Sequence, residues 1–330
     1  MDRFKVFRIH ADGDRVTAGF EQASVAELSP GDVVIRVAYS SINYKDALAA
    51  TGAGKILRSS PLVGGIDLSG TVVSSADPRY RPGDAVLVTG SGMSETRDGG
   101  YAEYARVPCD AVISMPPGLD LRTAMAVGTA GFAAALGIHK MELLGLAPGQ
   151  GPVVVTGATG GVGTLAIDML SARGHEVVAV SGKAGFDAYL RQLGAARILR
   201  RQELDLGKRP LERALWAGAV DNVGGEVLAW LTRTVDMNGS IASIGLAGGA
   251  DLKTTVMPFI LRGVNLLGVN SSATLREPRL ALWHRIATDL KPRHFDQVIT
   301  REIAFDELPT AFAEYVGGRV CGRTLVRVGT

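Results

Sequence analysis

Up to about Pro116 the chain alternates short apolar runs with polar positions, and turns that contain proline and glycine separate the runs. Two of these turns, at residues 29–32 and 81–84, read Ser-Pro-Gly-Asp and Arg-Pro-Gly-Asp. Runs with a period of two that end at such turns are typical of β-strands. We therefore expect a β-rich, barrel-like domain in this part of the chain, because many short strands joined by tight turns favour that architecture.

From about Asp120 the pattern changes to apolar strands that alternate with segments of helical length. Strands are expected over residues 153–155, 176–182, 196–199 and 240–245, and helices over 162–173, 186–193, 226–235 and 278–289, with a further helix before residue 219. Alternation of this kind predicts crossover units and a parallel sheet. The expected fold class is α/β, with a doubly wound parallel-sheet domain over residues 121–270 between two parts of the β-rich domain, 1–120 and 271–330.

The composition narrows the class of protein. The 330 residues are 46% hydrophobic and 21% charged, with a formal net charge of +2, so we expect a globular chain that binds neither nucleic acid nor a membrane surface. The first residues, MDRFKVFRIHADGD, lack the apolar core of a signal peptide. The two cysteines, Cys109 and Cys321, are far apart, which favours a reducing compartment. We predict a cytoplasmic protein.

The segment VVVTGATGGVGTLAIDML contains glycines spaced three apart, at Gly157, Gly160 and Gly163. Between a strand and a helix, this spacing is typical of a dinucleotide-binding loop, because glycines allow a tight turn, close approach to the diphosphate and close packing of helix on strand. The amide groups at the start of the helix also favour an anion. A purely structural glycine turn is the alternative.

The end of the next strand indicates which dinucleotide is bound. Proteins that select the unphosphorylated cofactor place an acid near this point for the ribose 2′-hydroxyl. Here Ser181, Gly182 and Lys183 offer a hydroxyl and an ammonium, which suit a 2′-phosphate. We therefore expect NADP(H) in preference to NAD, with a solvated loop lysine as the alternative for Lys183.

Metal ligands are sparse in this sequence. The cysteines are single, and the five histidines, at residues 10, 139, 175, 284 and 294, show no paired spacing. A catalytic zinc needs three protein ligands and a structural zinc needs clustered cysteines. We expect no metal site, so that any hydride chemistry has to polarise its substrate without a metal.

The order of these parts resembles the medium-chain dehydrogenase/reductase superfamily, in which a GroES-like β-rich barrel domain accompanies a Rossmann domain. SSINYKDALAATG and GGIDLSGTV are similar to the elements in which zinc alcohol dehydrogenases carry a catalytic cysteine and a Gly-His-Glu segment, but Asn43, Ile66 and Asp67 stand there instead. The zinc-free, quinone-oxidoreductase-like branch shares these losses. GTAGFAAAL, VVVTGATGGVG, LAGGADLKTTVMPFILRGVNLLGV and GRTLVRV recur in that order in its acrylyl-CoA reductase group.

The resemblance implies an oxidoreductase acting on a CH–CH group. Its reaction would be the NADPH-dependent reduction of the C=C bond of acryloyl-CoA, or another short enoyl-CoA thioester, to propionyl-CoA. Reduction of quinones or free α,β-unsaturated ketones is the alternative within the enzyme class. A non-catalytic NADPH-binding protein is the alternative outside it.

The resemblance also implies the site residues, motif by motif. The catalytic residues would be Tyr44 beside the nicotinamide, with Asn43 and Asp46 positioning the nicotinamide ribose and the loop. The diphosphate of the cofactor would be held by Thr159, Gly160, Gly161 and Val162, and its 2′-phosphate by Ser181, Gly182, Lys183 and Arg201. The nicotinamide pocket would be lined by Leu246, Ile260 and Ser271, and Arg323 would close the mouth of the cleft.

An alternative role is open for several of these residues. Hydride addition to an enoyl thioester places charge on the thioester oxygen, and Cα then needs a proton. Either the Tyr44 hydroxyl supplies the hydrogen bond or the proton, with Lys45 lowering its pKa, or its ring only packs on the nicotinamide. Asp46 is equally suited to be a helix N-cap. Thr129 either contacts the carboxamide or substrate, or caps the helix that follows it.

The apolar segment NLLGVNSS, residues 265–272, has the pattern of an edge strand. Exposed edges of this kind are usually paired or covered. We therefore expect a homodimer joined at this strand.

Overall fold

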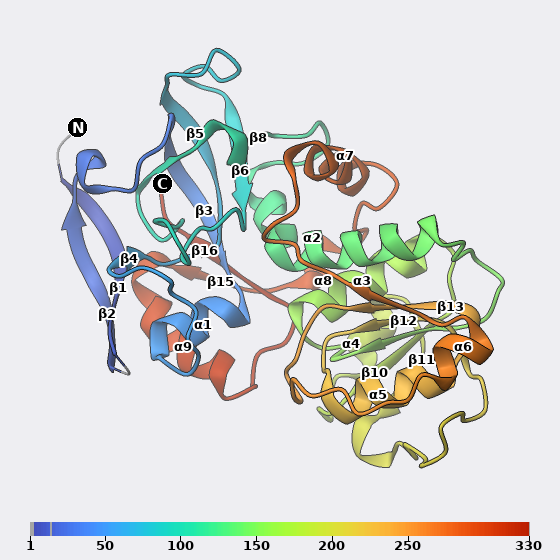
Figure 1. Ribbon diagram of the computed structural model, residues 1–330. Helices are drawn as coiled ribbons and strands as arrows, with labels where there is room; N and C mark the ends of the chain where they lie inside the picture. The colour runs from blue at the N-terminus through green and yellow to red at the C-terminus, as the bar shows by residue number, and fades with distance from the viewer. Residues whose placement is uncertain (1–2, 14, 330) are drawn as a thin grey trace. The chain divides into compact units, whose positions relative to one another are not determined.

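The computed structural model describes residues 3–13 and 15–329, which fold into two compact units (Figure 1). The first unit contains Met1–Thr129, Ser272–Ala287 and Ile299–Thr330, and the second contains Ala130–Ser271 and Thr288–Val298. The boundary between the two units therefore falls after Thr129, within a helix. The sequence had indicated a boundary at residue 120. Residues 288–298, expected in the β-rich domain, belong to the second unit.

The first unit is built on two sheets. In the smaller, the order is β2-β1-β4; in the larger it is β15-β16-β3-β5-β6-β8, with β7 also paired to β3. The strands are β1 (Phe4–Asp12), β2 (Arg15–Ala23), β3 (Val33–Ile42), β4 (Leu62–Val63), β5 (Asp67–Ser75), β6 (Ala85–Thr89), β7 (Tyr104–Val107), β8 (Ile113–Ser114), β15 (Ile299–Ala304) and β16 (Arg323–Arg327). The β-rich domain is confirmed, and the C-terminal strand returns to pair with β3.

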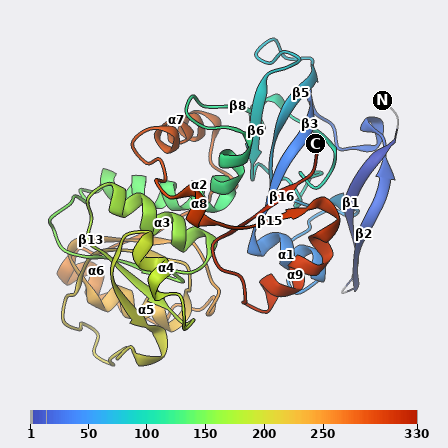
Figure 2. The same ribbon diagram turned by 180° about the vertical axis from the view of Figure 1, so that it is seen from behind.

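Helices cover part of this unit. They are α1 (Tyr44–Thr51), α7 (Arg276–Ala287) and α9 (Leu308–Val316), with 3-10 turns at Val25–Glu27, Cys109–Ala111 and Phe305–Glu307. Helix α1 follows β3 directly and packs beside α9, as Figures 1 and 2 both show. Beneath them the rings of Phe7, Tyr101 and Phe312 meet at centroid distances of 5.5–6.4 Å. The start of α1 therefore rests on a packed aromatic core.

The second unit contains a six-stranded parallel sheet in the order β11-β10-β9-β12-β13-β14. Its strands are β9 (Val153–Thr156), β10 (Val177–Ser181), β11 (Ala195–Arg200), β12 (Trp216–Asp221), β13 (Val235–Ser243) and β14 (Asn265–Gly268), and its helices are α3 (Gly161–Ala172), α4 (Asp187–Gln192), α5 (Gly225–Thr234), α6 (Met257–Arg262) and α8 (Phe295–Val298). The strand order reverses between β9 and β12, the position at which doubly wound sheets bind ligands. The parallel sheet and the edge position of β14 are as expected.

One expected helix is wrong. The described residues 204–215 contain no helix; after a 3-10 turn at Arg201–Glu203 the chain runs irregularly to β12. Gly207 takes a left-handed φ of 61°, and Pro210 lacks an amide donor, so a helix cannot continue through this segment. Leu204 and Leu206 pack instead against the core of the second unit.

Helix α2 (Leu121–Leu143) is interrupted at Gly128, where φ is 49° and ψ is −157°. Its length and apolar composition would suffice to cross a membrane, yet 78% of its apolar window is buried inside the protein. Burial therefore accounts for its apolar character.

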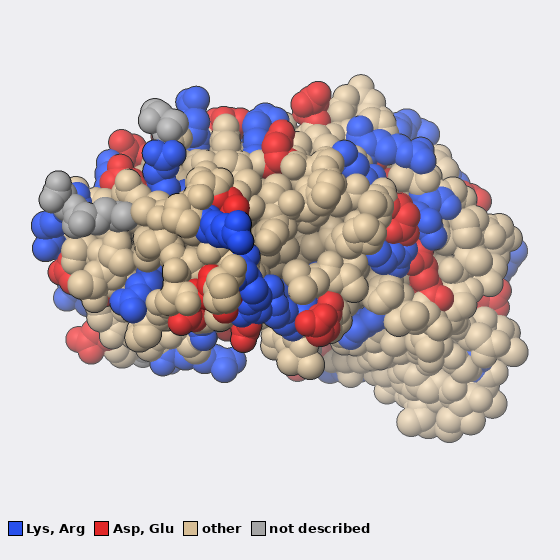
Figure 3. All heavy atoms as spheres, turned by 90° about the horizontal axis from the view of Figure 1, so that it is seen from above, with Lys and Arg blue, Asp and Glu red and all other residues tan. Residues whose placement is uncertain are grey.

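Acidic and basic side chains are mixed over the face shown in Figure 3, in keeping with the small net charge.

Candidate active site

The glycine-rich bend follows β9 in the second unit. Gly157 turns the chain with a φ of 60°, and Gly160 is the N-cap of α3. A Cβ on Gly163 would lie 2.4 Å from the carbonyl oxygen of Gly157, so only glycine lets α3 approach the bend this closely. Thr159, Gly160, Gly161 and Val162 lie together at this helix start. Its first amides have no partner within the helix and can bind a diphosphate.

Two residues that the sequence reasoning missed support the bend from the neighbouring strand. Asp221, buried at the end of β12, accepts hydrogen bonds from Thr156 Oγ1 (2.6 Å) and from the amide of Gly224 (2.9 Å). Asn222 Nδ2 donates to the carbonyl oxygen of Thr156 at 2.8 Å. Burial raises the pKa of Asp221. The ends of β9 and β12 are thus tied together at the reversal of strand order, and the polar pair in AVDNVGG, after a buried strand, was the available signal.

The residues expected at the 2′-phosphate lie together at the end of β10. The amide of Lys183 donates to Ser181 Oγ at 3.0 Å. A Cβ on Gly182 would lie 3.4 Å from Arg201 Nε, so the Arg201 guanidinium lies beside this glycine. The following acid, Asp187, pairs with Arg200 at 2.6 Å (Nη2 to Oδ1). The immediate surroundings of Gly182 are therefore basic, and a 2′-phosphate fits them.

The three residues expected at the nicotinamide stay a prediction. Leu246 and Ile260 have exposed side chains, at 66% and 72%. Leu246 follows β13, with its Cα 3.2 Å from the position of a Cβ on Gly224, while Ile260 lies on α6 and Ser271 ends the main segment of the second unit.

In the first unit, the three expected catalytic residues lie at the start of α1. Asn43 is the N-cap, and Tyr44, the first helical residue, has a side chain that is 47% exposed. Asp46 is not the N-cap: it lies at the third helical position and accepts from the amide of Asn43 at 2.8 Å, which forms a capping box. The amide of Ile66 donates to its other oxygen at 2.9 Å. Asp46 is therefore fixed on both oxygens.

A second buried acid, Asp67, accompanies this helix start. Its Oδ2 accepts from Asn43 Nδ2 and from Ser41 Oγ, both at 2.7 Å. Its Oδ1 accepts from the amide and the hydroxyl of Thr129, at 2.9 and 2.6 Å. Thr129 therefore bonds to Asp67 at the start of the second half of α2. The sequence reasoning noted Asp67 only as a replacement in the family motif and did not give it a role.

Arg323 has a different place from the one expected. We expected it at the mouth of the cofactor cleft, but its side chain is only 2% exposed. The guanidinium donates to the carbonyl oxygen of Ala126 (3.0 Å), to Asn43 Oδ1 (3.1 Å) and to Ser41 Oγ (2.7 Å). A buried guanidinium with these partners belongs to the cluster around Asp67, 3.8 Å from its carboxylate, and its contact with the cofactor stays a prediction.

The charges around Tyr44 are already paired. The ammonium of Lys45, which we considered as a neighbour that lowers the pKa of Tyr44, forms an ion pair with Glu95. Asp46 is 1% exposed, and burial, reinforced by the charge of Asp67, raises its pKa to about 7. The first turn of α1 thus carries the half-exposed Tyr44 together with a buried acid whose pKa is raised to about 7.

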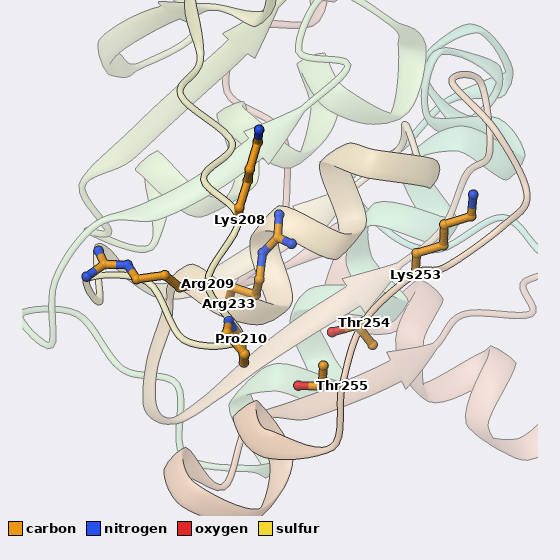
Figure 4. A pocket seen from close by; sticks show the side chains of 7 residues that line it. All are labelled: Lys208, Arg209, Pro210, Arg233, Lys253, Thr254 and Thr255. Carbon is orange, nitrogen blue, oxygen red and sulfur yellow. The ribbon is translucent and has the colours of Figure 1, made fainter.

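Two further features lie outside this arrangement. Among residues 3–13 and 15–329, no group of three or more His, Cys, Asp or Glu side chains is placed to hold a metal ion. A pocket of ≈ 450 Å³ in the second unit contains none of the predicted site residues, and it is lined by Lys208, Arg209, Pro210, Arg233, Lys253, Thr254 and Thr255. In Figure 4 the side chains of Lys208, Arg233 and Lys253 point to the same side.

The raised pKa of Asp46 predicts a dependence of stability on pH. An acid whose pKa is raised from 3.8 to about 7 on folding keeps its proton in the folded state after the unfolded chain has lost it. The free energy of unfolding therefore falls as pH rises from about 4 to about 7, by on the order of a few kcal/mol. Asp46→Asn should flatten this fall in urea unfolding at pH 4.5, 6 and 8, with exposed Asp110→Asn as control. An equally steep fall in Asp46→Asn would show that another group causes it.

Known proteins match both parts of the chain. Residues 29–117 match the alcohol dehydrogenase GroES-like domain, and residues 161–286 match the zinc-binding dehydrogenase family. Acrylyl-CoA reductase AcuI of Ruegeria pomeroyi is 46% identical over 318 residues, 96% of this chain and 96% of the relative. YhfP of Bacillus subtilis, named for quinone oxidoreductase activity, is 44% identical over 326 residues, 98% of this chain and 99% of the relative.

Solved structures show the same fold. The yhdH oxidoreductase of Salmonella enterica, in complex with NADP, gives a TM-score of 0.95 at 45% identity and covers 98% of this chain and 100% of its own. B. subtilis yhfP with NAD bound gives 0.95 at 44% identity, covering 99% and 100%. The chain therefore belongs to the medium-chain dehydrogenase/reductase superfamily, in the group of acrylyl-CoA reductases and quinone-oxidoreductase-like proteins.

Proposed function

We propose that this protein reduces the C=C bond of acryloyl-CoA, or another short enoyl-CoA thioester, with NADPH and without zinc. The observation that carries the proposal is the 46% identity over 96% of the chain to a relative named acrylyl-CoA reductase. Asn43 and Ile66 stand where zinc alcohol dehydrogenases carry ligands, in keeping with a mechanism that uses no zinc. Quinone reduction is the second candidate, favoured by the 44% identity to YhfP.

NADPH fits the residues at the bend. A Cβ on Gly163 would collide with the carbonyl oxygen of Gly157, so glycine there lets α3 begin close to the bend, and Arg201 Nε lies 3.4 Å from the Cβ position of Gly182. The first amides of α3 would hold the diphosphate, while Ser181, Lys183 and Arg201 would hold the 2′-phosphate. NADPH, when bound, supplies the hydride.

The protein's own contribution to the chemistry would come from the start of α1. Charge that develops on the thioester oxygen is stabilised by a fixed hydrogen-bond donor. The Tyr44 hydroxyl is the exposed donor at this helix start, and its neighbours Asn43 and Asp46 are held by the hydrogen bonds described above. Tyr44 would donate to the thioester oxygen or deliver the proton to Cα.

Lys183→Ala and Arg201→Ala should each weaken NADPH binding about 10- to 100-fold, because each removes a charged partner of the 2′-phosphate. NADH binding should change by less than about twofold, since it lacks that phosphate. Fluorescence titration with both cofactors measures this, and Lys208→Ala, on the basic pocket, is the matched control. Equal losses for NADPH and NADH would show that the pair does not bind the phosphate.

We expect NADPH oxidation with acryloyl-CoA to show a kcat/KM well above that with any quinone, unchanged by a chelator.

Tyr44→Phe should lower kcat by about 10²-fold if its hydroxyl is the donor, with KM for NADPH unchanged. Tyr39→Phe, on β3, is the control.

Three outcomes separate the candidates. A higher kcat/KM for quinones would favour the second candidate. Binding of NADPH without turnover of any acceptor would indicate a non-catalytic protein. An unchanged kcat in Tyr44→Phe would leave the ring as a packing surface.

We further propose that the protein is a cytoplasmic homodimer. Strand β14 ends the sheet of the second unit, and Leu266 on it is 37% exposed. Helix α6 and its N-cap carry Val256, Ile260 and Leu261 at 64%, 72% and 55% exposure. A second copy would cover both features if the two β14 edges paired around a two-fold axis.

Leu261→Glu should convert the dimer to a monomer, because it places a charge in the apolar contact. Sedimentation velocity at micromolar concentration measures this, with Leu275→Glu, 77% exposed in the first unit, as control. A Leu261→Glu variant that sediments with the wild-type coefficient would place the interface elsewhere.

A further inference from the structure

Asp67 is a buried carboxylate with donors from three separate elements. Its side chain is 0% exposed. Ser41 at the end of β3, Asn43 at the start of α1 and Thr129 in α2 all donate to it, at 2.6–3.0 Å. Both oxygens are used as acceptors, which is how a buried carboxylate offsets the cost of leaving water.

The break in α2 is shaped for this carboxylate. In an uninterrupted helix the amide of Thr129 would donate within the helix, but the non-helical Gly128 releases it to Asp67. A Cβ on Gly128 would lie 2.6 Å from Asp67 Oδ2 and 2.7 Å from Arg323 Nη2. Any other residue at 128 would therefore displace the carboxylate or the guanidinium.

Asn43 carries the effect of this cluster to the surface. Its Oδ1 accepts from Arg323 Nη1 at 3.1 Å, and its Nδ2 donates to Asp67 at 2.7 Å and to Asp46 at 3.2 Å. Both ends of the amide are therefore fixed. Because Asn43 is the N-cap of α1, its orientation sets the direction in which the next residue, Tyr44, leaves the helix start.

We propose that Asp67 is a positioning residue of the reductase, which holds Tyr44 in place through Asn43. The proposal rests on the proposed function, in which Tyr44 meets the substrate. Asp67 itself touches no solvent and makes no direct contribution to the reacting atoms. Loss of its second acceptor oxygen would release Asn43 and let the helix start rotate.

The same carboxylate acts on the titration of Asp46. The titratable groups that interact with Asp46 include Asp67, Tyr101 and Tyr315, and Arg323 bonds to Asn43, which also donates to Asp46. Among them, Asp67 contributes the like charge that adds to burial in raising the pKa of Asp46. Neutralising Asp67 therefore lowers the pKa of Asp46.

Asp67→Asn is the most informative variant, because asparagine keeps the shape of aspartate but replaces one acceptor oxygen with an NH2 group, which cannot accept a hydrogen bond from the donors around it. Asp98→Asn is the matched control: Asp98 is also buried in the first unit and accepts from Ser29 and from the amide of Val63, at 2.7–2.9 Å, without touching α1. We expect similar losses of Tm in the two variants. Only Asp67→Asn should lower kcat, by about 10- to 100-fold with KM for NADPH unchanged. It should also narrow the pH range over which the free energy of unfolding falls, because it lowers the pKa of Asp46.

The assay uses whichever acceptor the wild type reduces, enoyl-CoA or quinone, so the result does not depend on the substrate assignment. Amide hydrogen exchange over residues 43–51 provides a readout without turnover, and we expect faster exchange in Asp67→Asn only. If Asp67→Asn does not fold, Ser41→Ala removes one donor and should lower kcat severalfold. Wild-type kcat and exchange in the variant that folds, or equal effects in Asp98→Asn, would overturn the proposal.

Discussion

The structure of the first unit depends on the burial of Asp67 beside Asp46, with the guanidinium of Arg323 3.8 Å from the Asp67 carboxylate. Isolated charges in an apolar interior cost several kcal/mol unless they are paired and hydrogen-bonded. The partners come from β3, α1, α2 and β16, so none of these elements can satisfy the cluster alone. The charges therefore fix how the elements assemble, in addition to the apolar core around Phe7 and Phe312.

The start of α1 is held by hydrogen bonds at positions where zinc alcohol dehydrogenases carry metal ligands. Zinc alcohol dehydrogenases of the superfamily carry a cysteine and a histidine where this chain has Asn43 and Ile66. Asn43 now bridges Asp46, Asp67 and Arg323, and the backbone amide of Ile66 donates to Asp46. A hydrogen-bonded network thus holds the helix start, with the Tyr44 side chain exposed beside it.

The sequence was sufficient where the structure is local. The glycine bend, the basic end of β10 and the edge strand each depend on neighbouring residues, so spacing and residue type predicted them. Asp67 and Thr129 are 62 residues apart, and Arg323 is 197 residues from its partner Ala126, so these contacts form only after the chain has folded, and no spacing rule encodes them. The wrong helix before residue 219 has a different reason: Gly207 and Pro210 are local helix breakers that the sequence already contains, and Leu204 packs into the core of the second unit.

The cluster also contains two features that lower the stability of the folded state, and packing alone does not explain why they are present. Gly128 has a backbone conformation that other residues adopt only with strain, and Asp46 is buried beside the like charge of Asp67. An apolar replacement of similar volume would often be neutral or stabilising at a buried ion cluster. Local strain and unbalanced charge persist where function requires a fixed geometry. Gly128 lies against Asp67, and Asp67 holds the N-cap residue Asn43, so the strain and the buried charges together fix the geometry of the start of α1.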